Sequence, residues 1–153
     1  MRICLKIYYF QFLVKGWLLM FIQQFNANWN NIRFDIKFKD NITVIYGESG
    51  VGKSVLYRLM LDRYKAGKLK YNMYFFNADS SKEILKNSIF NSSVAVFVID
   101  NAAIMLDMDT RFFVSVDKRN QYIIFDHTLK GYSLGSNSRK RLVFSNNRMF
   151  LKV

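Results

Sequence analysis

The stretch that decides the fold spans residues 42–54 and reads Ile42-Thr43-Val44-Ile45-Tyr46-Gly47-Glu48-Ser49-Gly50-Val51-Gly52-Lys53-Ser54. Its first five residues are apolar or β-branched, which predicts a buried strand. The glycines that follow predict a tight loop, because glycine adopts backbone conformations that other residues avoid. Beyond the loop, apolar residues recur at helical spacing at Leu56, Leu59, Met60 and Tyr64. The sequence therefore predicts a strand, a loop and a helix in direct succession.

The loop matches the Walker A pattern for phosphate binding, Gly47-x-x-x-x-Gly52-Lys53-Ser54. Its bare N–H groups and the positive end of the following helix suit a polyphosphate. We expect Lys53 at the β- and γ-phosphates and the Ser54 hydroxyl on Mg²⁺. A glycine-rich turn that matches by chance is the alternative. The expected cofactors are ATP and Mg²⁺, and the expected binding residues are Gly47, Glu48, Ser49, Gly50, Val51, Gly52, Lys53, Ser54 and Val55.

A second decisive stretch, residues 94–100, is apolar throughout and ends in Asp100. Such a run is typical of a parallel strand covered on both faces. The final acid matches the Walker B pattern, in which the carboxylate lies beside the phosphate loop and holds Mg²⁺ through water. An ordinary strand-terminating aspartate is the alternative. We expect Ser54 and Asp100 as metal ligands and Lys53, Asp100 and Asn101 as catalytic residues.

On these two motifs the sequence resembles the P-loop NTPase superfamily, and Gly47-x-Ser49-Gly50-x-Gly52-Lys53-Ser54 is similar to the loops of ABC, AAA-type and related ATPases of the ASCE type. The resemblance implies an α/β fold of three layers, with a mostly parallel central sheet, and Mg²⁺-dependent ATP hydrolysis. It also implies that a polar residue after the next strand senses the γ-phosphate, and Asp126, His127 and Thr128 are the candidates. A surface-loop histidine is the competing interpretation of His127.

Several departures from the family pattern limit the prediction. The short stretch between Lys53 and residue 94 leaves no room for the helical insertion of an ABC transporter domain, and neither its signature sequence nor a guanine-reading motif is present. Asn101 stands where many ASCE enzymes carry a glutamate that activates water, and asparagine is a poor base. We therefore expect a slow ATPase, with a nucleotide-dependent switch lacking significant hydrolysis as the alternative. Glu48 adds a negative charge to the loop, without an assigned role.

Composition allows further partners. The chain of 153 residues carries a net charge of +12. This charge indicates either a surface that attracts nucleic acid, as in a DNA-associated ATPase, or anionic lipid, or else codon bias combined with a nucleotide site. The basic residues are spread along the sequence, and the one dense cluster is at residues 139–141. The single cysteine fits a cytoplasmic protein. A protein partner or a second copy could supply an arginine to the site, for which the candidates are Arg111, Arg119 and Arg139.

The predicted domain organisation is an apolar segment over residues 1–25 and a nucleotide-binding domain over residues 26–153. Lys6 and Lys15 interrupt the apolar segment, so a membrane anchor is disfavoured. An added helix or strand is a second interpretation of this segment. In a third, the natural start is Met20.

The remaining pattern predicts the other elements. Parallel strands are expected near residues 42–46, 71–76, 94–99 and 121–126, with antiparallel strands added at both termini. The alternating stretch 32–38 is expected to form a hairpin with 42–46. Helices are expected after a capping box at Ser80 to Glu83, with Ile84, Leu85 and Ile89 on one face, and over 102–106 and 111–116 with a polar break at 107–109. A terminal hairpin is expected around Asn146-Asn147. A small-molecule kinase is a further alternative function, for which the loop 136–141 is the candidate lid.

Overall fold

The structure is a computed structural model that describes residues 21–153. Over these residues the chain is an α/β protein with an eight-stranded mixed sheet in the order β1-β2-β8-β7-β3-β6-β5-β4. The strands are β1 (Gln24–Trp29), β2 (Ile32–Lys37), β3 (Ile42–Tyr46), β4 (Met73–Phe76), β5 (Val96–Ile99), β6 (Gln121–Asp126), β7 (Arg139–Ser145) and β8 (Arg148–Lys152). The helices are α2 (Lys53–Lys65), α3 (Lys82–Asn91), α4 (Ala102–Met105) and α5 (Met108–Val116).

The four predicted parallel strands form one half of the sheet. β4 pairs with β5, β5 with β6, and β6 with β3, all in parallel. β5 and β6 are buried along their whole length. The apolar sequence of β5 and the apolar centre of β6, between Gln121 and Asp126, therefore fit a position in the sheet where both faces are covered.

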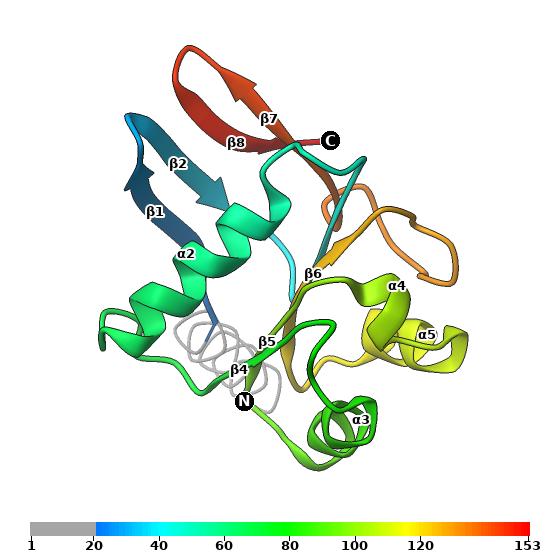
Figure 1. Cartoon of the computed structure of the whole chain (residues 1–153). Helices are drawn as coiled ribbons and strands as arrows, with labels where there is room; N and C mark the ends of the chain where they lie inside the picture. Colours follow the sequence, from blue (N-terminus) through cyan, green and yellow to red (C-terminus); the bar gives the residue numbers. More distant parts are fainter. Residues whose placement is uncertain (1–20) are drawn as a thin grey trace, which may run out of the picture.

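Helices cover both faces of this parallel half. On β5, Val96 and Val98 pack into one core, which also takes Leu56 and Met60 of α2. The alternate residues of β5 pack into a second core with residues of α3, α4 and α5. Figure 1 shows α2 on one side of the parallel strands and the other three helices on the opposite side. None of the helices within residues 21–153 combines the length and apolarity needed to cross a membrane.

The strands from the two termini extend the sheet beyond β3. β1 and β2 form an antiparallel hairpin around Asn30-Asn31, and β7 and β8 form another around Asn146-Asn147. All four turn asparagines have positive φ, as the tightest hairpin turns require. The hairpins join the sheet through two parallel pairings, β2 with β8 and β7 with β3. This antiparallel addition at both ends was expected, although the parallel joints were not.

The predicted hairpin between residues 32–38 and 42–46 is wrong. β3 lies between β6 and β7, so both of its edges are occupied by parallel partners. β2 pairs instead with β1, because the Asn30-Asn31 turn brings β1 back against it. Phe21 and Ile22 are buried with Phe25 in the core on the α2 side. The expectations about an anchor or a start at Met20 concern residues that lie outside the described part of the chain.

Two details of the helices also differ from expectation. Ser81, rather than Ser80, caps α3, and the Ser81 hydroxyl accepts the Ile84 N–H at 3.3 Å. Leu85 and Ile89 are buried as predicted, but Ile84 is 60% exposed. The expected polar break at 107–109 belongs mostly to α5, because Asp107 caps that helix by accepting the Thr110 N–H.

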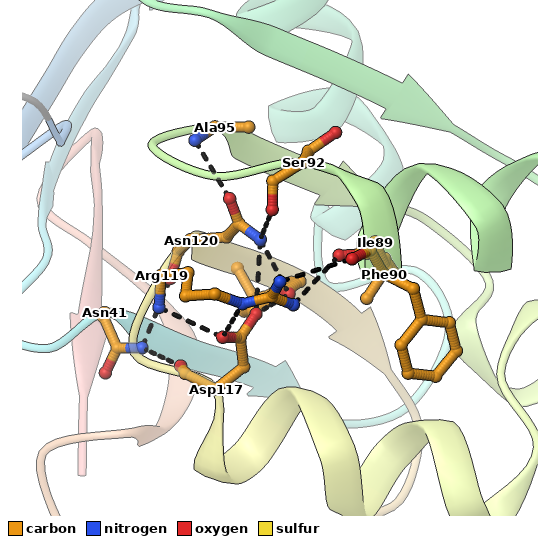
Figure 2. Close-up of polar contacts among 9 residues, drawn as sticks. Asn41, Ile89, Phe90, Ser92, Ala95, Asp117, Arg119 and Asn120 are labelled. Atoms are coloured by element: carbon orange, nitrogen blue, oxygen red, sulfur yellow. Dashed lines mark hydrogen bonds and ion pairs between the residues drawn. The ribbon is translucent and has the colours of Figure 1, made fainter.

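A buried polar network closes the amino edge of the parallel strands (Figure 2). Asn120 accepts the Ala95 N–H at 3.0 Å through its side-chain oxygen and donates to the Ser92 carbonyl at 3.0 Å. Asn41 donates to the Asp117 carbonyl at 2.6 Å. Arg119 bonds the Asp117 carboxylate at 3.0 Å and donates to carbonyls at the end of α3. These contacts tie the loop before β6 to the neighbouring strands and to α3.

Candidate functional site

The loop between β3 and α2 is curled, as the sequence predicts. Gly47, Gly50 and Gly52 have φ values of +144°, +85° and +97°, which side chains rarely tolerate. α2 begins at Lys53 without a side-chain cap. Among the described residues, no protein acceptor pairs with the N–H groups of residues 49–52. The loop therefore offers free amide donors at a helix start, which is the arrangement that binds anions.

Lys53 closes the curl from within. Its ammonium donates to the carbonyl oxygens of Gly47 at 2.6 Å and Glu48 at 2.5 Å. Burial lowers the pKa of Lys53, and the nearby charges of Asp100, Asp126 and Glu48 partly oppose this shift. The ammonium thus lies at the mouth of the loop, close to carboxylates of two other strands.

A pocket of about 360 Å³ lies against the loop. The carboxyl ends of β5 and β6 meet there because parallel strands end at the same edge of the sheet. The pocket gathers all three residues expected to be catalytic and both expected metal ligands. Its polar lining comes from Ser49, Lys53, Ser54, Asp100, Asn101, Asp126 and His127, and its other lining residues include Gly50, Gly52 and Val55. The expected binding residues Gly47, Glu48 and Val51 do not line it.

Asp100 is held at the carboxyl end of β5. It is 8% exposed, and its carboxylate accepts the Asn101 N–H at 3.0 Å. Asn101 is exposed and left-handed, with φ 51°. Asp100 and Ser54 also line a larger hollow of about 760 Å³ beside α2, together with Asn77. Asn77 was not predicted, although its position directly after β4 follows the same strand-end logic that identified Asp100.

The donor atoms in this pocket fit Mg²⁺. Ser54 supplies a hydroxyl oxygen and Asp100 a carboxylate, and Mg²⁺ prefers oxygen ligands. It is usually held by one or two protein groups together with phosphates and water. Within residues 21–153, no cluster of three or more histidine, cysteine or acidic side chains forms a metal cage.

Asp126, one of the three candidate sensors, is buried and fully engaged. Its carboxylate accepts the Tyr132 hydroxyl at 2.8 Å and the Thr128 N–H at 3.2 Å, and it pairs with Arg111 at 3.5 Å. Burial raises the pKa of Tyr132, and the adjacent Asp126 charge raises it further. Of the other candidates, His127 lines the pocket with a side chain that is 68% exposed, whereas Thr128 does not line it.

None of the three candidate arginines lines the pocket, although Arg111 pairs with its lining residue Asp126. Arg111 is only 4% exposed and donates to the Lys130 carbonyl at 2.9 Å, so the expectation that it reaches a neighbouring subunit is wrong. It holds the loop after β6 against α5 instead. Arg119 is bound to Asp117 at the opposite edge of the sheet, and Arg139 is exposed on β7. A role for either of these two in a neighbouring subunit stays a prediction.

An apolar groove of about 460 Å³ lies on the other side of the loop. Gly50, Gly52 and Val55 line both hollows, so the groove and the pocket beside Lys53 meet across the loop. The rest of the lining is Trp29, Ile32, Phe34, Val51, Leu142, Phe144 and Met149. Sequence reasoning missed this groove because its walls come from two hairpins, β1–β2 and β7–β8, that lie far apart in the chain.

Comparison of the chain with protein-family models, curated proteins and solved structures finds no match. A function for this site therefore follows from its motifs and its geometry.

Proposed function

We propose that this chain is a Mg²⁺-dependent ATP-binding domain of the P-loop NTPase type that hydrolyses ATP slowly. One observation carries the proposal: the curled loop with free amides is closed by Lys53 and shares a pocket with Ser54 and Asp100. Helices on both faces of the parallel strands support the three-layer form of that fold. Because many functions occur on α/β folds, the proposal rests on the site and not on the fold class.

Binding exchanges internal contacts for contacts with phosphate. The N–H groups of residues 49–52 donate to phosphate oxygens, and the helix start adds its positive end. Lys53 releases the carbonyl oxygens of Gly47 and Glu48 and pairs with the phosphates. Ser54 and Asp100 would hold Mg²⁺, which when bound neutralises charge that develops on the phosphate oxygens.

Slow turnover follows from the groups that face the γ-phosphate. Asn101 can orient a water by hydrogen bonding but accepts a proton poorly. Asp126 already accepts hydrogen bonds from Tyr132 and Thr128 and pairs with Arg111, so its carboxylate oxygens already have partners. His127 is exposed in the pocket and can contact the γ-phosphate or its water. The same observations favour a second candidate function, a nucleotide-dependent switch that releases no phosphate.

The groove beyond the loop offers a place for the base. A purine ring is flat and largely apolar, and Trp29 and Val51 line the groove close to the loop. We place the adenine there, with the ribose crossing the loop at Gly50. Quenching of the Trp29 fluorescence during an ATP titration, and its loss in Trp29→Phe, is the expected signal.

Calorimetric titration with Mg-ATP tests the proposal. Lys53→Ala should weaken binding by about 10²-fold or more, because it removes a charge-assisted contact to the phosphates. Lys68→Ala is the matched control, since it removes one exposed lysine just beyond α2. Asp100→Asn should keep the Asn101 contact and lose the dependence of binding on Mg²⁺. Equal affinities for Lys53→Ala and Lys68→Ala would overturn the proposal, and phosphate release by the wild type separates the ATPase from the switch.

A further inference from the structure

One half of the sheet leaves a face open. The core formed with α3, α4 and α5 takes residues from β3, β4, β5 and β6, and none of its buried members comes from β1, β2, β7 or β8 in the described chain. The opposite face of these four outer strands packs into the core on the α2 side. Figure 1 shows the two terminal hairpins next to each other, away from α3, α4 and α5. Within residues 21–153, no helix therefore packs a core against their outer face.

The register of the strands places several basic side chains on this open face. Arg33 of β2 pairs with Arg148 of β8, and Arg141 of β7 pairs with Lys152 of β8. Residues paired across neighbouring strands point to the same side of the sheet. The exposed cations that this alternation places on the open face are Arg33, Lys37, Arg139, Arg141, Arg148 and Lys152. They come from two segments at opposite ends of the described chain, β2 and the β7–β8 hairpin, so the sequence alone does not show them as one patch.

The acidic side chain on these strands, Asp35, is already neutralised. It is 9% exposed, pairs with Arg148 and accepts a hydrogen bond from Gln24 at 3.2 Å. Burial tends to raise the pKa of Asp35, but these bonds outweigh it and lower the pKa. Among the described residues, no carboxylate lies within salt-bridge distance of the remaining cations of the face. The face therefore carries a net positive field.

Aromatic and amide groups accompany the cations. The guanidinium of Arg141 lies over the ring of Tyr46 at 4.9 Å, and that of Arg148 lies over Phe150 at 5.4 Å. Unpaired bases stack on aromatic rings and on guanidinium planes. On β1, the exposed amide side chains that pair with this face are Gln24, Asn26 and Asn28. Amides of this kind hydrogen-bond to base edges.

We propose that the open face of β1, β2, β8 and β7 binds single-stranded nucleic acid. Its cations contact phosphates, the two arginine–aromatic pairs stack against bases, and the amides of β1 contact base edges. A lipid surface would use the cations alone, whereas the aromatic pairs and amides suit bases. The proposal stands apart from nucleotide binding, although Tyr46 directly precedes Gly47 and so joins the face to the phosphate loop.

Fluorescence anisotropy with labelled oligo-dT and oligo-U over a series of salt concentrations tests this proposal. For single strands, the logarithm of the binding constant falls with the logarithm of salt by about 0.7 per neutralised phosphate. Arg33→Gln/Lys37→Gln/Lys152→Gln should therefore reduce that slope by about 2. Lys68→Gln/Lys70→Gln/Lys82→Gln is the control, because it removes the same charge from exposed lysines elsewhere.

Four further comparisons make the outcome decisive. Arg141→Lys keeps the charge but removes the planar guanidinium, so it should weaken binding several-fold with an unchanged salt slope. Equal losses in the patch variant and the control would overturn the proposal, as would equal affinity for duplex DNA. Binding to phosphatidylserine vesicles without binding to either oligonucleotide would overturn it in favour of a membrane. Tighter binding of oligo-U than of oligo-dT would support it and identify RNA as the ligand. Circular dichroism checks that each variant is folded.

Discussion

Polar groups lie at both edges of the parallel strands, but the two edges differ in how many of these groups already have hydrogen-bond partners. At the amino edge, the Asp117 carboxylate accepts from the Tyr122 hydroxyl at 2.5 Å, from Asn120 and from Arg119. At the carboxyl edge, the N–H groups of residues 49–52 have no acceptor among the described residues. A buried network that is fully satisfied stabilises the fold, whereas unpaired donors leave interactions for a ligand to complete.

The electrostatics of the amino edge agree with a structural role. Burial raises the pKa of Asp117, but hydrogen bonds from Tyr122 and Arg119 outweigh it, so the net shift is downward. Burial raises the pKa of Tyr122, and the bond to Asp117 raises it further. The carboxylate is therefore charged and the phenol neutral at pH 7.

The largest expected effect is at the amino edge. Asp117→Ala should lower the free energy of unfolding by about 3–5 kcal/mol, because it leaves buried donors unpaired. Denaturant unfolding measures this loss. The ATP affinity of the protein that remains folded should not change, since Asp117 lies at the opposite end of the strands. A weaker affinity with unchanged stability would reverse the roles of the two edges.

The next effect belongs to the carboxyl edge. Asn101→Glu should raise the rate of phosphate release by about 10²-fold, because it supplies the missing general base. Asn101→Gly is the control, since glycine adopts the left-handed conformation at this position but adds no base. If Asn101→Glu hydrolyses ATP no faster than this control, Asn101 is not what limits turnover.

A moderate effect is expected from Asn41, which directly precedes β3 and donates a hydrogen bond into the network. Asn41→Ala should cost about 1–3 kcal/mol, because Asn41 is 1% exposed and its loss leaves the Asp117 carbonyl without its donor. Thermal unfolding detects the change. Asn137→Ala, in an exposed loop, serves as the comparison and should change stability little.

The smallest expected effect concerns how the free energy of unfolding depends on pH in the acid range. The pKa of Asp117 is lower in the folded than in the unfolded chain, where it is near 3.9. The stabilisation that ionised Asp117 gives the fold is therefore complete above its unfolded-state pKa, and it is lost as the pH falls through the folded-state pKa. Denaturant titrations from pH 6 down to about pH 3 should show a shallower decline for Asp117→Asn than for the wild type. An identical decline would mean that Asp117 has no depressed pKa.

Local sequence predicted much of the candidate site because the required features are local. The strand 42–46, the curled glycines and the start of α2 follow from neighbouring residues. The position of Asp100 was also predicted, because a continuous apolar run is a clear sequence signal for a buried parallel strand. The residue that follows such a strand lies at the edge of the sheet. The sequence missed that Asp126 is already engaged by Arg111 and Tyr132, because that contact depends on how α5 packs beside β6.

The sequence by itself determined the four parallel strands, the glycine-rich loop between a strand and a helix, and the hairpin turn at Asn146-Asn147. The turn at Asn30-Asn31 has the same residue types but was not predicted. Only the tertiary structure decided that β2 joins β8 rather than β3, that four strands enclose the groove beside Val51, and that scattered cations share one open face. The physical reason is the separation along the chain over which each interaction acts. Backbone preferences and apolar periodicity act between neighbours in the chain, whereas strand order and register depend on which distant surfaces bury each other.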